Sequence, residues 1–126
     1  MRVVRSLIFG ILVLLARNGI AQAQTWQPVA NQPGFNAQVP VLLTDGTVLV
    51  QNFDSSLWYR LSPDALGNYV NGTWTPVASS PAGYGPLDHV SAVLGDGRMV
   101  VIGGKYNLEL YAMTNQGAIY SPFTNT

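Results

Sequence analysis

The chain has 126 residues with six basic and six acidic side chains, so its formal net charge is zero at neutral pH, and it contains no cysteine. Three of the basic residues lie within the first 23 positions, which leaves residues 24–126 with three basic and six acidic side chains and no cluster of Lys or Arg. Binding to nucleic acid or to an anionic membrane by phosphate neutralisation needs such clusters, so the composition argues against both partners. Without disulfides, stability has to come from burial.

The first 23 residues are typical of a secretory signal peptide. A short basic start precedes a helical apolar run at residues 7–16, and a small-x-small pattern ends at Ala23. The run is about half as long as the roughly 20 residues of a membrane-spanning helix. We expect cleavage after Ala23, a secreted or periplasmic location and no stable membrane insertion afterwards. The alternative, an uncleaved anchor, is disfavoured because Arg17 interrupts the apolar run.

The remaining residues, 24–126, contain an internal repeat. Residues 24–33 (QTWQPVANQP) recur as residues 72–81 (GTWTPVASSP) with six of ten positions identical, and their tryptophans are 48 positions apart. An Asp-Gly pair follows each copy, at 45–46 and at 96–97, and these pairs are 51 positions apart. A unit of about 50 residues is typical of β-propellers and related repeat arrays.

The first unit is predicted as four strands. Residues 24–34 are expected to be the end of one blade's outermost strand with its exit loop, and Trp26 to be a packing residue. Strands are then predicted at 39–43 and 47–51, joined at Asp-Gly by a type I′ turn, which needs positive φ at both central residues. The third strand is expected at residues 57–61 and the fourth is expected to end at Thr73-Trp74.

The second unit repeats this plan. Strands are expected at 89–94 and 98–102, a third within 108–113 and a fourth from Gly117. The next tryptophan of the period is expected at position 127, one beyond the last residue given. Propellers close a ring of about four to eight blades, so two units form an incomplete propeller. Such a pair exposes apolar faces and strand edges, and we expect self-association through these blade edges.

At this point the motifs support a family resemblance. The sequence from Asp88 to Gly104 has a strand, an Asp-Gly turn and a strand that ends in Gly103-Gly104, and Tyr120 with Pro122 follows. This order resembles the kelch repeat of galactose-oxidase-like propellers, and it covers residues 24–126. The first unit departs from it, because Gln51 and Asn52 stand where Gly-Gly is expected.

The resemblance implies an all-β fold of antiparallel four-stranded kelch-type blades, preceded by the signal-peptide helix, with about two blades in residues 24–126. Together with the predicted signal peptide, the resemblance leads us to expect an exported binding or scaffolding module without catalysis, whose ligand is a protein or a carbohydrate.

Two alternatives remain open. One is the N-terminal part of a larger galactose-oxidase-like copper oxidase, and the other is a truncated remnant without independent function. The related enzymes use two tyrosines, two histidines and a cysteine at a copper radical site. This chain has one histidine and no cysteine, so we assign no catalytic residue, no cofactor and no metal ligand.

His89 is the only histidine, and its neighbour Asp88 suggests a histidine-carboxylate pair. We favour a structural role, because one histidine is insufficient for a transition-metal site and the first unit has Gln38 at the equivalent place. Asp45 and Asp96 occupy equivalent turns, so turn chemistry explains them better than acid-base catalysis does.

Four aromatic residues are candidates for a carbohydrate or peptide surface: Trp58, Tyr59, Tyr84 and Tyr106. We expect Trp58 to pack in the core. Tyr84 lies in a loop rich in Gly and Pro, and loops carry function more often than the scaffold does, so Tyr84 is the preferred binding candidate.

Overall fold

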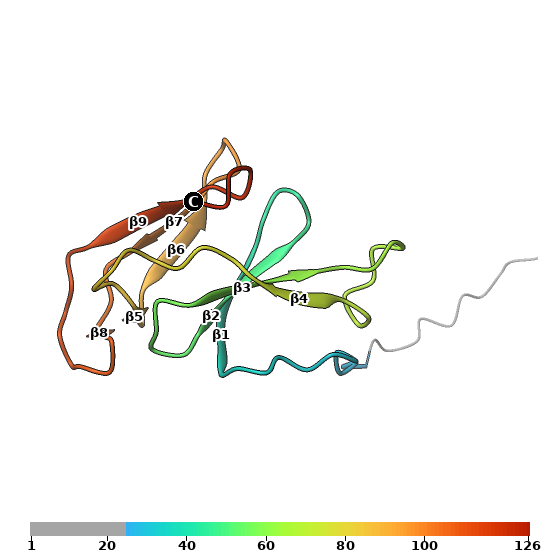
Figure 1. The fold of residues 1–126 in the computed structure, drawn as a ribbon, viewed down its shortest axis with the longest axis horizontal. Coiled ribbons are helices and arrows are strands. Elements are labelled where there is room, and N and C mark those ends of the chain that lie inside the picture. The colour runs from blue at the N-terminus through green and yellow to red at the C-terminus, as the bar shows by residue number, and fades with distance from the viewer. Residues whose placement is uncertain (1–24) are drawn as a thin grey trace, which may run out of the picture.

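The computed structural model describes residues 25–126, which form an all-β structure without a helix. The predicted all-β, antiparallel fold class is thereby confirmed. The predicted signal peptide and its helix lie outside the described residues, and residues 25–126 include no helix long and apolar enough to cross a membrane. Figure 1 shows the nine strands, which are β1 (Ala37–Leu42), β2 (Val48–Asn52), β3 (Trp58–Ser62), β4 (Thr73–Pro76), β5 (Pro86–Leu87), β6 (Val90–Val93), β7 (Met99–Ile102), β8 (Tyr106–Asn107) and β9 (Gly117–Tyr120).

The first sheet is an antiparallel meander in the order β1-β2-β3-β4. Val48 and Leu61 are register partners between β2 and β3, and Leu61 is in turn the partner of Trp74 on β4. These apolar side chains share one face of the sheet, because successive residues of a strand point to opposite faces. The predicted four-strand plan of the first unit is therefore present in this sheet.

The second sheet has three strands, in the order β6-β7-β9, and a short pair β5-β8 lies apart from it. The prediction of a third strand within residues 108–113 was wrong. Most of that segment is an exposed loop, and β9 takes the third place in the sheet by pairing with β7. The described part of this sheet consequently has no counterpart of β4.

The two Asp-Gly turns have the same structure. Leu43 donates its N–H to the carbonyl of Thr47 at 2.8 Å, and Leu94 donates to that of Arg98 at 2.7 Å. Only the glycines have positive φ, 79° at Gly46 and 86° at Gly97. The predicted type I′ turn was therefore wrong, since the aspartates lack positive φ. A three-residue loop with a left-handed glycine is the other common hairpin connection.

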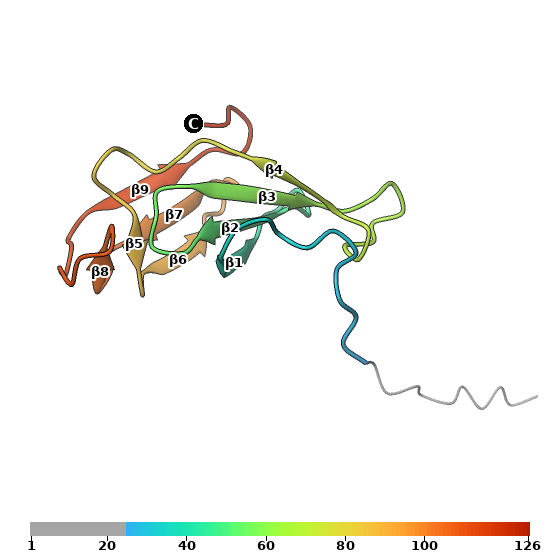
Figure 2. The same cartoon turned by 60° about the horizontal axis from the view of Figure 1, so that its bottom comes forward.

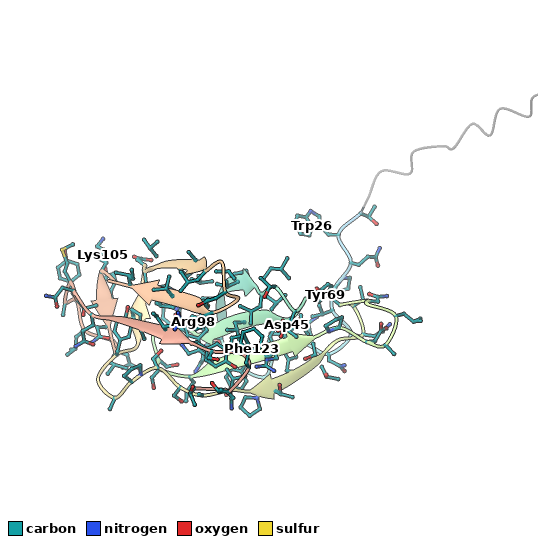
Figure 3. All side chains as sticks on the ribbon, turned by 90° about the horizontal axis from the view of Figure 1, so that it is seen from above. Trp26, Asp45, Tyr69, Arg98, Lys105 and Phe123 are labelled. Atoms are coloured by element: carbon teal, nitrogen blue, oxygen red, sulfur yellow. The ribbon has the colours of Figure 1, made fainter. Side chains whose placement is uncertain are left out.

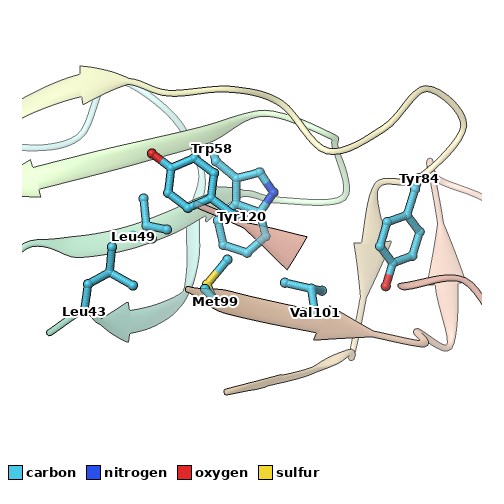
Figure 4. Packing of buried hydrophobic residues seen from close by; sticks show 7 residues of the cluster. All are labelled: Leu43, Leu49, Trp58, Tyr84, Met99, Val101 and Tyr120. Carbon is cyan, nitrogen blue, oxygen red and sulfur yellow. The ribbon is translucent and has the colours of Figure 1, made fainter. Parts of the chain in front are cut away.

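The two sheets pack face to face with the core between them. Figure 4 shows the buried cluster, in which Leu49 of β2 and Trp58 of β3 lie over Met99 and Val101 of β7. At one edge of this stack β1 lies beside β6, and the strands run side by side in Figure 2. Burial of such side chains contributes about 1.5–3 kcal/mol each, so the interface between the sheets is the main source of stability.

The N-terminal segment covers the far face of the first sheet. Phe35 stacks on Tyr59 with ring centroids 4.0 Å apart and meets Trp74 edge-on at 5.3 Å. The strand and packing predicted for the residues before Phe35 were wrong. Residues 25–34 form no strand, and Trp26 is fully exposed instead of packed. No other described side chain covers the ring of Trp26.

Candidate functional site

The segment between β7 and β9, which includes β8, carries a cluster formed by Lys105, Tyr106 and Tyr111, in which Lys105 and Tyr111 are exposed and Tyr106 is half-buried. The rings of Tyr106 and Tyr111 meet edge-on with centroids 5.2 Å apart. The ammonium of Lys105 lies 5.6 Å from the centroid of Tyr106 and 5.8 Å from that of Tyr111. Each cation–π contact contributes about 0.5–1 kcal/mol at an exposed site, so the cluster has a preferred geometry although it faces solvent.

This loop is anchored at its base by Asn107. The side-chain oxygen of Asn107 accepts a hydrogen bond from the N–H of Gly85 at 2.8 Å, and its amide donates to the carbonyl of Gly83 at 2.9 Å. Tyr111 is 69% exposed beyond this anchor, with Leu110 and Met113 also exposed. Exposed aromatic and apolar side chains on an anchored loop are typical of binding surfaces. Figure 3 shows Lys105 at the opposite end of the molecule from Trp26.

His89 is placed as a structural residue. Its Nδ1 lies 3.2 Å from the carbonyl oxygen of Pro86, and its ring meets that of Trp58 edge-on at 6.0 Å. Its Nε2 is buried without a hydrogen-bond partner among residues 25–126. Burial lowers the pKa of His89, although the Pro86 carbonyl and the charge of Asp88 oppose this shift. A neutral imidazole between Pro86 and Trp58 has a packing role.

The carbonyl of Pro86 also belongs to a buried polar network around Gln51. Gln51 is fully buried, and its amide donates to the carbonyls of Ser55 at 2.7 Å and Pro86 at 2.9 Å. Its oxygen accepts from the amide of Gln38 at 3.1 Å. Every polar side-chain atom of Gln51 has a hydrogen-bond partner within the fold. The network therefore holds the first sheet to β5 and leaves no polar atom of this side chain for a ligand.

A cavity of about 170 Å³ lies between the sheets beside β9. Its lining is mainly apolar and includes Trp58, Ala118 and Tyr120, and residues 77–81 line its other side. The indole N–H of Trp58 donates to the hydroxyl of Ser80 at 2.9 Å. The lining has no histidine, acid or cysteine, so the cavity is suited to an apolar group and offers no acid-base chemistry.

The remaining sequence candidates have structural roles. Trp58 is buried in the core as predicted, and Tyr59 stacks on Phe35. Tyr84, the preferred binding candidate, is only 1% exposed and donates its hydroxyl to the carbonyl of Gly103 at 2.9 Å. It is therefore unavailable to a ligand, and Tyr106, which is half-buried, is the one candidate that belongs to the cluster around Tyr111. Tyr111 was missed because the segment around it was interpreted as a strand.

Asp45 and Asp96 each accept hydrogen bonds from residues of their own turn. Burial raises the pKa of Asp45, but hydrogen bonds from the N–H and hydroxyl of Thr47 outweigh it and lower the pKa overall. Hydrogen bonds from the backbone and side chain of Arg98 lower the pKa of Asp96. Each carboxylate stabilises a turn, as expected.

Across residues 25–126, no group of three or more His, Cys, Asp or Glu side chains is positioned to hold a metal ion. Comparison with protein-family models, with curated proteins and with solved structures finds no match. The repeat and the exposed surfaces of residues 25–126 are the remaining indications of function.

Proposed function

We propose that residues 24–126 form two neighbouring blades of a kelch-type β-propeller, and that the exported chain is a non-catalytic binding or scaffolding module. The proposal combines the motif order in the sequence with the repetition seen in the two sheets. It assigns no reaction, because the cluster around Tyr111 contains neither a nucleophile with an adjacent base nor a set of metal ligands.

The observation that carries the proposal is the repetition of turn and register. The offset of 51 between the Asp-Gly turns relates Val48 to Met99, and the register partners of these two residues, Leu61 and Tyr120, are each followed by Ser-Pro. The two sheets thus present equivalent positions in the same order. Such stacking of like units around a common axis is how propellers are built.

The cluster of Lys105, Tyr106 and Tyr111 is the proposed ligand surface. Tyrosine offers a large, rigid contact area with a hydroxyl at its tip, which suits both sugar rings and peptide groups. The lysine adds a positive charge to the surface of residues 24–126, in which acidic side chains outnumber basic ones six to three. A protein or a carbohydrate with an accessible apolar face is the ligand class that fits this arrangement.

The test is a screen of the full chain against glycans and extended peptides, followed by affinity measurements on any ligand found. Tyr111→Ala is expected to weaken binding roughly tenfold, for a loss of about 1.4 kcal/mol. Leu66→Ala is the matched control, because Leu66 is also an exposed apolar side chain and lies on the loop between β3 and β4. The proposal is wrong if Tyr111→Ala binds as tightly as the unsubstituted chain, or if no ligand of either class binds.

A further inference from the structure

The second sheet ends in an unpaired strand edge. In the first sheet β4 pairs with the outer side of β3, whereas in the described part of the chain β9 pairs only with β7. An exposed strand edge presents free N–H and C=O groups that can pair with another strand. The missing position is the one that β4 occupies in the first sheet.

The chain contains a second segment with the sequence of β4. Residues 25–30 read TWQPVA and residues 73–78 read TWTPVA, so five of the six positions are identical. Residues 73–76 form β4, but residues 25–30 form no strand, and Trp26 is fully exposed. This sequence thus forms a strand at residues 73–76, where the edge of β3 is available. Residues 25–30 have no neighbouring strand edge in the described chain and form no strand.

We propose that residues 25–30 of a second copy of this chain bind the free edge of β9 and complete its sheet, so that copies associate head to tail. This inference rests on the proposed repeat architecture and names the contact through which the chain would assemble. The interface is heterologous, since one end of each copy meets the other end of the next, and such contacts generate closed rings or open filaments.

The register of the first sheet predicts the register of the new pair. Leu61 is the partner of Trp74 and Arg60 is the partner of Thr75. Transferred to β9, this register sets Trp26 opposite Tyr120 and Gln27 opposite Ile119. Tyr120 is on the face that packs against the first sheet, and it lines the cavity of about 170 Å³. The incoming Trp26 therefore lies on the side of β9 where an apolar cavity is present.

The chain's own N-terminal segment is held away from this edge. Ala30 donates its N–H to the carbonyl of Val70, and the side chain of Asn31 donates to the carbonyl of Gly72 at 2.8 Å. These contacts fix the segment beside the loop that precedes β4. Figures 1 and 2 both show this region at the opposite end of the molecule from β9. In the proposed assembly, residues 25–30 of a separate copy supply the strand.

The outer face of the second sheet fits the same arrangement. It is wholly apolar and largely exposed, with the exposed side chains of Val90, Ile102 and Ile119 joined by Ala92 and Val100. By the same offset Val100 corresponds to Leu49, whose face is covered by the second sheet. In the proposed assembly the first sheet of the next copy would cover the outer face in the equivalent way, which explains a contiguous apolar surface.

Cysteine cross-linking tests the predicted register, since the chain has no native cysteine. Gln27→Cys and Ile119→Cys are prepared as separate full-length variants, mixed and oxidised. Opposed residues of an antiparallel pair lie roughly 4.5–5.5 Å apart between Cα atoms, within the span of a disulfide. We expect a reducible heterodimer, formed on the order of tenfold more than by Gln27→Cys mixed with Leu66→Cys, whose cysteine is exposed but distant from β9.

A third variant checks the fold itself. Ser62 and Thr73 are register partners on β3 and β4, so Ser62→Cys with Thr73→Cys in one chain should form an internal disulfide. If this control forms and the mixed pair gives no more product than the Leu66 control, the inference is wrong, while the ligand surface around Tyr111 is unaffected. If the internal disulfide fails to form, the register between β3 and β4 is wrong. Both the proposed blade architecture and the proposed pairing of residues 25–30 with β9 are then wrong as well.

A peptide provides a measurement that depends on no substitution in the chain. A synthetic peptide of residues 24–33 should bind the unsubstituted chain and compete with the mixed cross-link. The same peptide with Trp26→Ala should bind roughly tenfold more weakly or worse, because the apolar anchor is lost. Equal binding by the two peptides would overturn the assignment of Trp26 to the cavity.

Discussion

Arg60 on β3 donates a hydrogen bond from Nη2 to the hydroxyl of Tyr120 on β9 at 2.7 Å, across the interface between the two sheets. The hydroxyl of Tyr120 in turn donates to the side-chain oxygen of Asn125 at 3.0 Å. The Nε of Arg60 is buried without a partner among residues 25–126. This guanidinium therefore depends on Tyr120 for its contact with the second sheet.

Removing that hydroxyl should cost stability. Tyr120→Phe keeps the ring but leaves Arg60 without its acceptor, and a hydrogen bond to a charged group is worth about 1.5–3 kcal/mol. We expect the free energy of unfolding to fall by about that amount in a urea titration. Tyr111→Phe is the control, since this tyrosine is exposed, and its effect should stay below about 0.5 kcal/mol. Equal effects of the two variants would contradict a linking role for Tyr120.

The stability of the chain should depend on burial between the sheets rather than on the outer face. Met99→Ala removes a buried side chain from the core and should lower the free energy of unfolding by about 2–5 kcal/mol. Ile102→Ala, on the exposed outer face of the same strand, should cost far less in the isolated chain. Comparable losses at the two positions, measured by denaturant unfolding, would show that the outer face is already covered.

The lowered pKa of His89 predicts a loss of stability at mildly acidic pH. Burial lowers its pKa below the ordinary value of 6.5, so the unfolded state takes up a proton before the folded state does. The contribution of His89 is fully present above pH 6.5 and is lost as the pH falls through the lower pKa of the folded state. Unfolding midpoints measured from pH 8 to pH 4.5 should show this decline.

His89→Gln supplies the control for this pH dependence. It removes the titrating group while keeping a hydrogen-bonding side chain near the carbonyl of Pro86. Its stability should vary less between pH 7 and pH 5 than that of the unsubstituted chain. An unchanged pH profile would assign the decline to other groups. The acids with lowered pKa, Asp45, Asp64 and Asp96, lose their contributions only at pH values below about 3.8.

The two turn glycines should differ in their tolerance of a side chain. Both have positive φ, so alanine is strained at either position by about 1–2 kcal/mol. At Gly97 an added Cβ would also meet the hydroxyl of Thr44 at 2.9 Å and the ring of Phe123 at 3.1 Å, whereas at Gly46 the nearest atom is 3.8 Å away. Gly97→Ala should therefore destabilise the chain more than Gly46→Ala in thermal unfolding. The reverse order would contradict the described contact between the two turns.

Local sequence patterns predicted the strands on both sides of the Asp-Gly turns, because those apolar runs and turn residues act within one hairpin. They failed where distant contacts decide. Tyr84 was assigned to an exposed loop from its Gly and Pro neighbours, but its hydroxyl reaches the carbonyl of Gly103 and buries the ring. Residues 108–113 are apolar enough for a strand, yet β9 already pairs with the available edge of β7.

The repeat explains the remaining error. Trp26 was predicted to be a packing residue at the end of an outermost strand, and its neighbours in sequence are nearly identical to those of Trp74. Trp74 has Leu61 of β3 as its register partner and Phe35 against its ring. Trp26 has neither within the described residues of one chain. The sequence of residues 25–30 favours a strand, as its near-copy in β4 shows. No strand of the described chain pairs with residues 25–30, so Trp26 is exposed.

The most direct measurement is the native mass of the full chain over a range of concentrations, by mass spectrometry or sedimentation. Head-to-tail pairing of residues 25–30 with β9 predicts discrete species at whole-number multiples of the chain mass, and Trp26→Ala should shift them toward the mass of one chain. A chain that stays monomeric at every concentration, or an oligomer that persists unchanged in Trp26→Ala, would contradict this arrangement.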